Sequence, residues 1–216
     1  MKNPFTLEPE AKNEAYNFID KFYKKLPRNE DGSIREFGSD FSDNDIDALR
    51  HSYTSGVFTQ EYSEKVAEIF GDLREFSPGG GSSASNSIQS KNMDYWNNAV
   101  GRKYGKKTTS RIKLFKLLLK ALKNGELITD PDEDKRIYDG KISNTDDLKD
   151  KVIVIKETKK GRNILFFDLK NQIFLSLVDF VTKIKSGEYP NYEVRIVKGR
   201  EVPASKGDTS PSDNLG

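Results

Sequence analysis

The residues best suited to chemistry surround the only histidine of the chain, in the segment DALRHSY that begins at Asp47. A histidine side chain gains and loses a proton near neutral pH, so His51 is a candidate general acid or base. Asp47 and His51 are four residues apart, and this spacing makes them neighbours on a helix. Arg50 falls on the apolar face of the same helix. Because an unpaired guanidinium is very costly to desolvate, we expect Arg50 to be paired or hydrogen-bonded.

A second polar segment reads MDYWNNAVGR and has the spacing of an amphipathic helix. Asn97 falls on its apolar stripe, so we expect this side chain to be buried. Asp94, Asn98 and Arg102 follow one another at intervals of four residues and form a polar ladder beside that stripe. Gly101 costs a helix about 1 kcal/mol relative to alanine. A close approach by another helix or by a ligand would explain its presence.

A third candidate is Glu75, which ends a predicted helix and precedes the Gly/Ser-rich run 77–85. This run is typical of a flexible connection, and the alternative is a mobile flap over a site. It is not a phosphate-binding P-loop, because no Gly-Lys-Ser/Thr follows it. The polar residues then divide into acid–base groups and groups that bind substrate oxygens. The catalytic candidates are His51, Glu75 and Asp94, and the binding candidates are Arg50, Asn97, Asn98 and Arg102.

The same residues also fit a purely structural role. Arg50, Asp94, Asn97 and Arg102 would then satisfy one another and hold three helices in register. The two interpretations predict different effects of a substitution on the stability of the protein. Removing a structural group destabilises the fold, whereas removing a catalytic group often does not. No metal is expected, because the chain has no cysteine and a single histidine, which argues against an ordinary zinc site. No cofactor is expected either.

Helical periodicity dominates the first half of the chain, and the period changes after residue 150. Ser42 or Asp43 is the expected N-cap of the second helix, and Thr59 that of the third. The predicted helices span residues 8–25, 43–57, 59–76, 92–104 and 108–123. Beyond them, 152–155 and 163–167 predict a hairpin around the turn 159–162, 172–185 predicts a helix, and 192–197 predicts a third strand.

These elements predict an α+β fold that is mainly α. An N-terminal helical bundle, residues 1–125, carries the polar site. A small α+β unit, residues 126–198, has an antiparallel sheet and one helix, and it could pack with the bundle as one domain. Residues 199–216 are rich in Pro, Ser, Gly and Asp and predict a flexible tail.

Composition limits the partners. The chain has 216 residues with 36 basic and 34 acidic side chains, a balance that argues against a dedicated nucleic-acid binder. No apolar run approaches the roughly 20 residues that span a bilayer, and the N-terminus lacks the apolar core of a signal peptide. Residues 109–123 form a basic amphipathic helix; a half-buried helix with a solvated face is favoured, and peripheral membrane contact is the alternative.

The segments that begin at Arg50 and at Met93, with a Glu at the end of the helix between them, resemble an uncharacterised bacterial domain. Its members read roughly Arg-His-Ala-Tyr-Trp, then His-Glu, then Met-Asp-x-x-Asn-Asn-x-x-Gly-Arg. The resemblance covers residues 43–105, and the chain departs from it at Thr54 and Arg74. That domain often ends polymorphic toxins and other exported bacterial proteins. The resemblance implies a toxin or effector, and it implies no mechanism.

Three functions stay open. The first is an exported bacterial toxin or effector with a hydrolase-like pocket. It would be cytoplasmic in the producing cell, exported without a signal peptide, and served by secretion or contractile injection machinery and an immunity protein. The second is a non-catalytic cargo or interaction protein. The third is a peptidoglycan muramidase that uses Glu75, with Asp94 or Glu61 as its second carboxylate.

Overall fold

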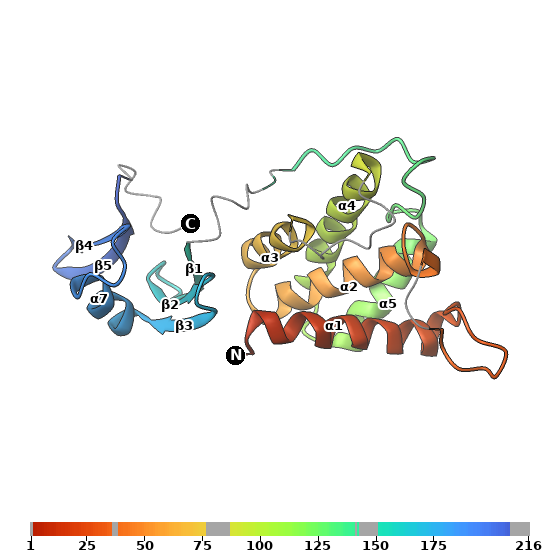
Figure 1. Ribbon diagram of the computed structural model, residues 1–216, viewed down its shortest axis with the longest axis horizontal. Coiled ribbons are helices and arrows are strands. Elements are labelled where there is room, and N and C mark those ends of the chain that lie inside the picture. Colours follow the sequence, from red (N-terminus) through yellow and green to blue (C-terminus); the bar gives the residue numbers. More distant parts are fainter. Residues whose placement is uncertain (1, 36–38, 77–86, 141, 143–150, 208–216) are drawn as a thin grey trace. The chain divides into compact units, whose positions relative to one another are not determined.

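The computed structural model describes residues 2–35, 39–76, 87–140, 142 and 151–207 (Figure 1). It confirms an α+β fold that is mainly helical. The chain divides into two compact units, residues 1–145 and 146–216. The first unit contains the helices α1 (Pro4–Phe18), α2 (Asp45–Glu61), α3 (Glu64–Phe76), α4 (Ile88–Gly105) and α5 (Arg111–Lys123). A π-helical turn, Ile19–Tyr23, extends α1, and a short 3-10 helix, Ser39–Phe41, precedes α2.

Side-chain caps fix where α2 and α3 begin. Asn44 caps α2, because its Oδ1 accepts two backbone N–H groups at 3.0 and 3.1 Å, so the expected cap at Ser42 or Asp43 was wrong. The expected cap at Thr59 was also wrong. That residue lies inside α2 and its hydroxyl donates to the carbonyl four residues earlier. The hydroxyl of Ser63 instead accepts an N–H group at the start of α3.

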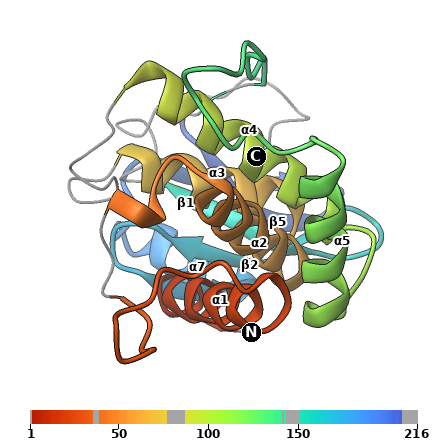
Figure 2. The same cartoon turned by 90° about the vertical axis from the view of Figure 1, so that its right-hand side faces the viewer.

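Helix α2 is the central element of the first unit, and it packs against α1, α3, α4 and α5 (Figures 1 and 2). Glycines allow α4 to lie very close to it. A Cβ atom on Gly101 would stand 2.0 Å from the backbone oxygen of Ser52, and one on Gly105 would stand 2.6 Å from that of Gly56. The close approach expected at Gly101 is therefore made by another helix. This contact sets the distance between the polar segments of α2 and α4.

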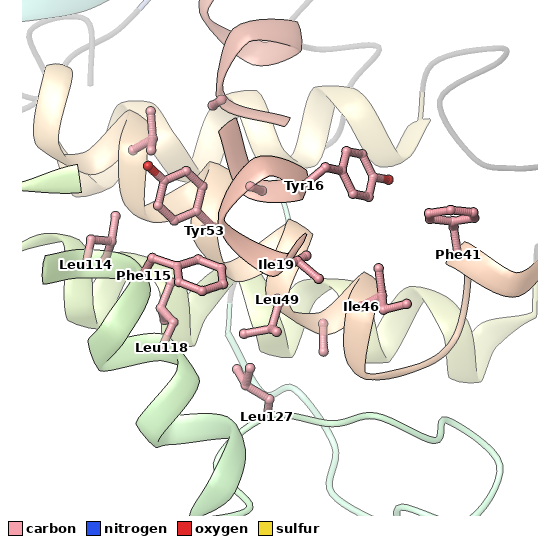
Figure 3. Close-up of a cluster of buried hydrophobic side chains, with 14 of the residues drawn as sticks. Tyr16, Ile19, Phe41, Ile46, Leu49, Tyr53, Leu114, Phe115, Leu118 and Leu127 are labelled. Carbon is pink, nitrogen blue, oxygen red and sulfur yellow. The ribbon is translucent and has the colours of Figure 1, made fainter. Parts of the chain in front are cut away.

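Aliphatic and aromatic side chains together fill the core between α1, α2 and α5 (Figure 3). Phe115 is fully buried, and its ring centroid lies 5.4 Å from that of Phe18, 5.9 Å from that of Tyr53 and 6.0 Å from that of Phe22. These separations are those of favourable aromatic pairs. The apolar face of α5 is therefore inside the core. Its lysines lie exposed on the outer face: Lys113, Lys116, Lys120 and Lys123.

The chain after α5 returns to the helices of the first unit. Gly125, at φ +71°, follows the end of α5. Leu127 and Ile128 are then buried in the helical core, and the ring of Tyr138 stacks on that of Tyr95 in α4. Residues 126–138 had been expected to open the α+β unit. They pack with the bundle because their apolar side chains and backbone groups find partners there.

The second unit contains a three-stranded antiparallel sheet in the order β1 (Val152–Glu157), β2 (Asn163–Asp168), β3 (Ile173–Ser176). The β1–β2 hairpin confirms the sequence prediction. The expected helix from residue 172 was wrong in its first turn. Gln172 has a positive φ of 55°, and the chain reverses there so that β3 pairs with β2. The helix α7 (Leu177–Lys185) begins only after Ser176, whose hydroxyl accepts the N–H of Asp179.

A two-stranded ribbon completes this unit. The predicted strand β4 (Tyr192–Val197) pairs with β5 (Arg200–Ser205) rather than with the first hairpin. Residues 200–205 had been expected to belong to a flexible tail, and that expectation was wrong. Lys198 and Gly199 both have positive φ, 51° and 73°, which is the conformation of a tight two-residue hairpin turn. Across the described helices of the chain, none combines the length and apolar character needed to cross a bilayer.

Candidate active site

Four polar side chains meet where α2 faces α4: Asp47, Arg50 and His51 from α2, and Asp94 from α4. Their side chains are at most 17% exposed. The guanidinium of Arg50 binds Asp47 through Nε, which donates to Oδ1 at 3.0 Å, and through Nη2. The other carboxylate oxygen of Asp47 accepts the backbone N–H of Asp43 at 2.9 Å. Arg50 is therefore paired, as its position on an apolar helix face requires.

The Nε2 atom of His51 contacts one hydrogen-bond donor, the guanidinium of Arg50, and two acceptors, the carboxylates of Asp94 and Asp47. Arg50 Nη2 lies 2.6 Å away, whereas Asp94 Oδ1 lies 3.2 Å away and Asp47 Oδ1 lies 3.5 Å away. A guanidinium always donates, so its contact is favourable when Nε2 carries no proton. A carboxylate accepts, so its contacts are favourable when Nε2 is protonated. The protonation state of His51 thus decides which neighbours hold it.

Burial and charge oppose each other in this cluster. Burial alone would raise the pKa of the Asp47 carboxyl, but the charge that His51 carries when protonated and the charge of Arg50 outweigh burial and hold that pKa below its ordinary value. On the side of α1, burial raises the pKa of the Tyr16 hydroxyl to about 12. Burial, followed by the charge of Arg50, lowers the pKa of the Lys12 ammonium. Asp47 is therefore ionised and Tyr16 neutral at physiological pH.

A pocket opens beside the cluster, between α1, α2, α3 and α4. Its enclosed volume is about 30 Å³, and about 390 Å³ lies outside protein atoms when the solvent at its open side is counted. Arg50 and His51 form part of its wall. The other lining residues are Glu8, Thr54, Ser55, Phe58, Ala67, Phe70, Gly71, Arg74 and Asn98.

The structure brings part of the sequence-predicted site together at this pocket. Arg50, His51 and Asn98 line it, and Asp94 contacts His51 without lining the pocket. Asn98 is 5% exposed, and a Cβ atom on Gly71 of α3 would lie 3.5 Å from its Nδ2. These residues come from neighbouring turns of α2 and α4, which the glycine contact holds together.

The remaining predicted residues lie elsewhere. Asn97 is fully buried, and its amide bonds both backbone groups of Ile128, with Nδ2 donating to the carbonyl at 2.9 Å and Oδ1 accepting the N–H at 3.0 Å. Arg102 donates to Tyr138 at 3.2 Å and contacts Glu68 of α3 at 3.4 Å. Glu75 lies in α3, but its side chain and the Gly/Ser run 77–85 are outside the described residues.

The cluster also has the composition of a metal site. The ligand atoms of Asp47, His51 and Asp94 all lie within 4.8 Å of one another. However, Arg50 contacts two of these atoms, Oδ1 of Asp47 and Nε2 of His51. A cation among the three ligands would stand against the guanidinium charge. The residues therefore fit an internal ion-pair network better than a metal.

Sequence reasoning missed the residues that α1 and α3 contribute. Glu8 of α1 forms an ion pair with Arg74 of α3, and both line the pocket. No local sequence pattern predicted this ion pair, because its two residues are 66 positions apart in the chain. Thr54 and Ser55 carried a weak signal, since they place two hydroxyls one turn after His51. The four-residue spacing between Asp47 and His51 was a clearer signal, since it makes the two side chains neighbours on a helix.

One comparison with known proteins gives a match. A family model described as "Domain of unknown function (DUF6973)" matches residues 9–126, more than half of the chain. The matched range contains α2, α4 and every lining residue of the pocket except Glu8. No curated protein and no solved structure matches the chain.

Proposed function

Because the chain belongs to the family described as "Domain of unknown function (DUF6973)", whose description gives no activity, we propose its function from the chemistry of the pocket. The domain is a hydrolytic bacterial toxin or effector, and His51 is its general acid–base group. The observation that carries the proposal is the position of His51 Nε2, between the donor Arg50 and the acceptor Asp94, at the wall of a pocket.

Proton transfer follows from these contacts. Neutral His51 takes a proton at Nε2 from a water molecule as that water attacks the substrate, which requires the Arg50 N–H to leave the Nε2 lone pair, and the imidazolium returns the proton to the leaving group. The carboxylate of Asp94, 3.2 Å from Nε2, stabilises the imidazolium while it exists. A well-placed acid–base group of this kind contributes about 10²–10⁴-fold to a reaction rate.

Arg50 has a second role in the same step. Protonation of His51 turns its 2.6 Å contact with Arg50 into a repulsion between two cations. The guanidinium then favours a neighbouring negative charge, and it lines the pocket where the attacked group of the substrate becomes negative. Proton uptake by His51 and stabilisation of the transition state are coupled through Arg50. Asn98 is the further hydrogen-bonding group of this wall.

The toxin role rests on the sequence resemblance of the Arg50 and Met93 segments to domains that end exported bacterial proteins. It implies passage through secretion or contractile injection machinery and an immunity protein that blocks the pocket in the producing cell. Expression in a bacterial host tests it. We expect the full chain to stop growth in the cytoplasm or, with an added signal peptide, in the periplasm, and His51→Gln to grow normally in both. A His51→Gln chain as toxic as the wild type would refute the mechanism.

A non-catalytic cargo or interaction protein is the second candidate, and one observation favours it. The carboxylate of Asp47 is satisfied within the cluster by Arg50 and by the backbone of Asp43, as a structural network requires. In that case His51→Gln would lower the free energy of unfolding. A muramidase is the third candidate, and it predicts that Glu75→Gln abolishes clearing of purified peptidoglycan. Glu61, its alternative second carboxylate, is bound to Arg111 and lies outside the pocket lining.

A further inference from the structure

Three side chains in the pocket wall carry buried polar atoms that have no hydrogen-bond partner among the described residues. They are Thr54 Oγ1, Ser55 Oγ and Arg74 Nε. Ser55 is only 5% exposed. An unsatisfied buried polar group costs about 1–3 kcal/mol, so native proteins rarely retain one without a reason. Here three such atoms border the same pocket, and all three can donate a hydrogen bond.

Other hydroxyls of α2 show that this is not the ordinary behaviour of the helix. Ser52 donates to the carbonyl of Ala48 at 2.7 Å, and Thr59 donates to the carbonyl of Ser55 at 3.0 Å. A helical Ser or Thr commonly bonds the carbonyl four residues earlier in this way. Thr54 and Ser55 do not. Their hydroxyls are therefore available to a group that lies outside the helix, in the pocket.

The charge of the pocket selects an anion. Its described lining contains the guanidinium groups of Arg50 and Arg74, and Glu8 is the one carboxylate in that set. Glu8 pairs with Nη1 of Arg74 and leaves Nε without a partner. The Glu8 side chain is 34% exposed, and partly exposed ion pairs contribute little to stability. A ligand oxyanion can therefore replace Glu8 and bind the guanidinium through two N–H groups.

We infer that the pocket binds its substrate through an anionic oxygen group, a phosphate or a carboxylate, held by Arg74, Thr54 and Ser55 in the place that Glu8 occupies in the free protein. The inference rests on the proposed function and names the substrate class of the same site. The wall also has an apolar part, in which the rings of Phe58 and Phe70 lie at a centroid distance of 5.6 Å. The substrate is thus an organic anion whose apolar part lies on these rings.

Calorimetric titration of the full chain with phenyl phosphate, benzoate and phenol tests this inference. We expect at least one of the two anions to bind and phenol to bind at least tenfold more weakly. Binding of phenyl phosphate alone identifies a phosphate, and binding of benzoate alone identifies a carboxylate. Absence of binding of both anions up to about 10 mM, well above the usual range of substrate affinities, would overturn the inference. Equal binding of phenol would do the same.

Two variants connect binding to the named atoms. Ser55→Ala should weaken anion binding about tenfold, since it removes one hydrogen bond to a charged group, without lowering stability, since that hydroxyl has no partner to lose. Glu8→Gln should strengthen binding, because it removes the competing carboxylate. Ser52→Ala is the matched control on α2 and should bind as the wild type does. Unchanged affinity in both Ser55→Ala and Glu8→Gln would contradict the inference.

The outcomes separate this inference from the proposed function, because binding needs no catalysis. If the anions bind as expected and His51→Gln remains toxic, the proposed function fails and the anion site stands. If His51→Gln abolishes toxicity and neither anion binds, only the anion site fails.

Discussion

The contact between α2 and α4 gives the sharpest test of how the site is positioned, and Gly101→Ala is the perturbation. The added Cβ atom would stand 2.0 Å from the oxygen, 2.8 Å from the carbonyl carbon and 2.9 Å from the Cα atom of Ser52. An ordinary carbon–oxygen contact is about 3.3 Å, so the two helices must separate by roughly 1 Å. The obstacle is backbone, which cannot rotate away as a side chain can.

The expected cost follows from two opposing terms. Alanine improves helix propensity by about 1 kcal/mol, whereas overpacking of a closed interface costs about 1–3 kcal/mol and occasionally more. Because the whole helix must move, we expect the upper end of this range and a net loss of about 2 kcal/mol. For a unit of this size that loss lowers the melting temperature by roughly 6–8 °C.

Gly71→Ala is the matched control on the neighbouring helix. Its Cβ atom would meet nothing closer than Asn98 Nδ2 at 3.5 Å, so the variant should gain about 0.5–1 kcal/mol from helix propensity. Urea unfolding followed by tryptophan fluorescence measures both, because the single tryptophan, Trp96, lies in α4 and reports on the helical unit alone. A Gly101→Ala midpoint at or above that of the wild type would refute the reasoning, as would equal losses in the two variants.

Three further predictions concern other parts of the fold. Phe115→Ala should lower the free energy of unfolding by about 3–5 kcal/mol in the same fluorescence assay, whereas Phe5→Ala, 42% exposed and paired edge-on with the ring of Phe70, should lower it by about 1 kcal/mol. Asn97→Ala leaves both backbone groups of Ile128 without their partner and should cost about 2–4 kcal/mol in that assay; a loss below 1 kcal/mol would contradict its structural role. Burial would raise the pKa of Asp168, but bonds from Tyr189 and from Asn171 lower it. The stability from Asp168 is therefore present above its ordinary pKa of 3.8 and is lost as pH falls below it, so circular-dichroism melts of Asp168→Asn should show a smaller loss at acid pH than those of the wild type.

Local sequence patterns predicted the parts of the site that lie on single helices. The 3.6-residue period placed Arg50 and Asn97 on buried faces, and the glycine at 101 indicated a close neighbour. The patterns did not identify the partner of Asn97, because Ile128 is 31 residues away and follows another helix. They also did not identify the pair of Glu8 and Arg74. Such contacts depend on how the helices pack, which no window of neighbouring residues contains.

Two secondary-structure predictions were wrong because local sequence patterns do not show which strands pair in the folded protein. The apolar spacing from Ile173 to Ile184 fits one continuous helix, but the positive φ at Gln172 lets Ile173–Ser176 pair with β2 before the helix begins. The polar composition after Gly199 is typical of a tail, yet the two-residue turn at Lys198 and Gly199 returns the chain as β5. In both cases a strand pairing that short-range periodicity does not encode determined the outcome.

The most direct test of the central claim is to measure killing and stability together for His51→Gln, with Asn97→Ala as the structural control. If His51 is the acid–base group, His51→Gln should lose its toxicity while its free energy of unfolding stays within about 0.5 kcal/mol of the wild type. Asn97→Ala should lose stability, and its toxicity only in proportion to the unfolded fraction. Full toxicity in a stably folded His51→Gln chain, or a loss of toxicity that merely follows unfolding in both variants, would contradict the claim that His51 performs the chemistry.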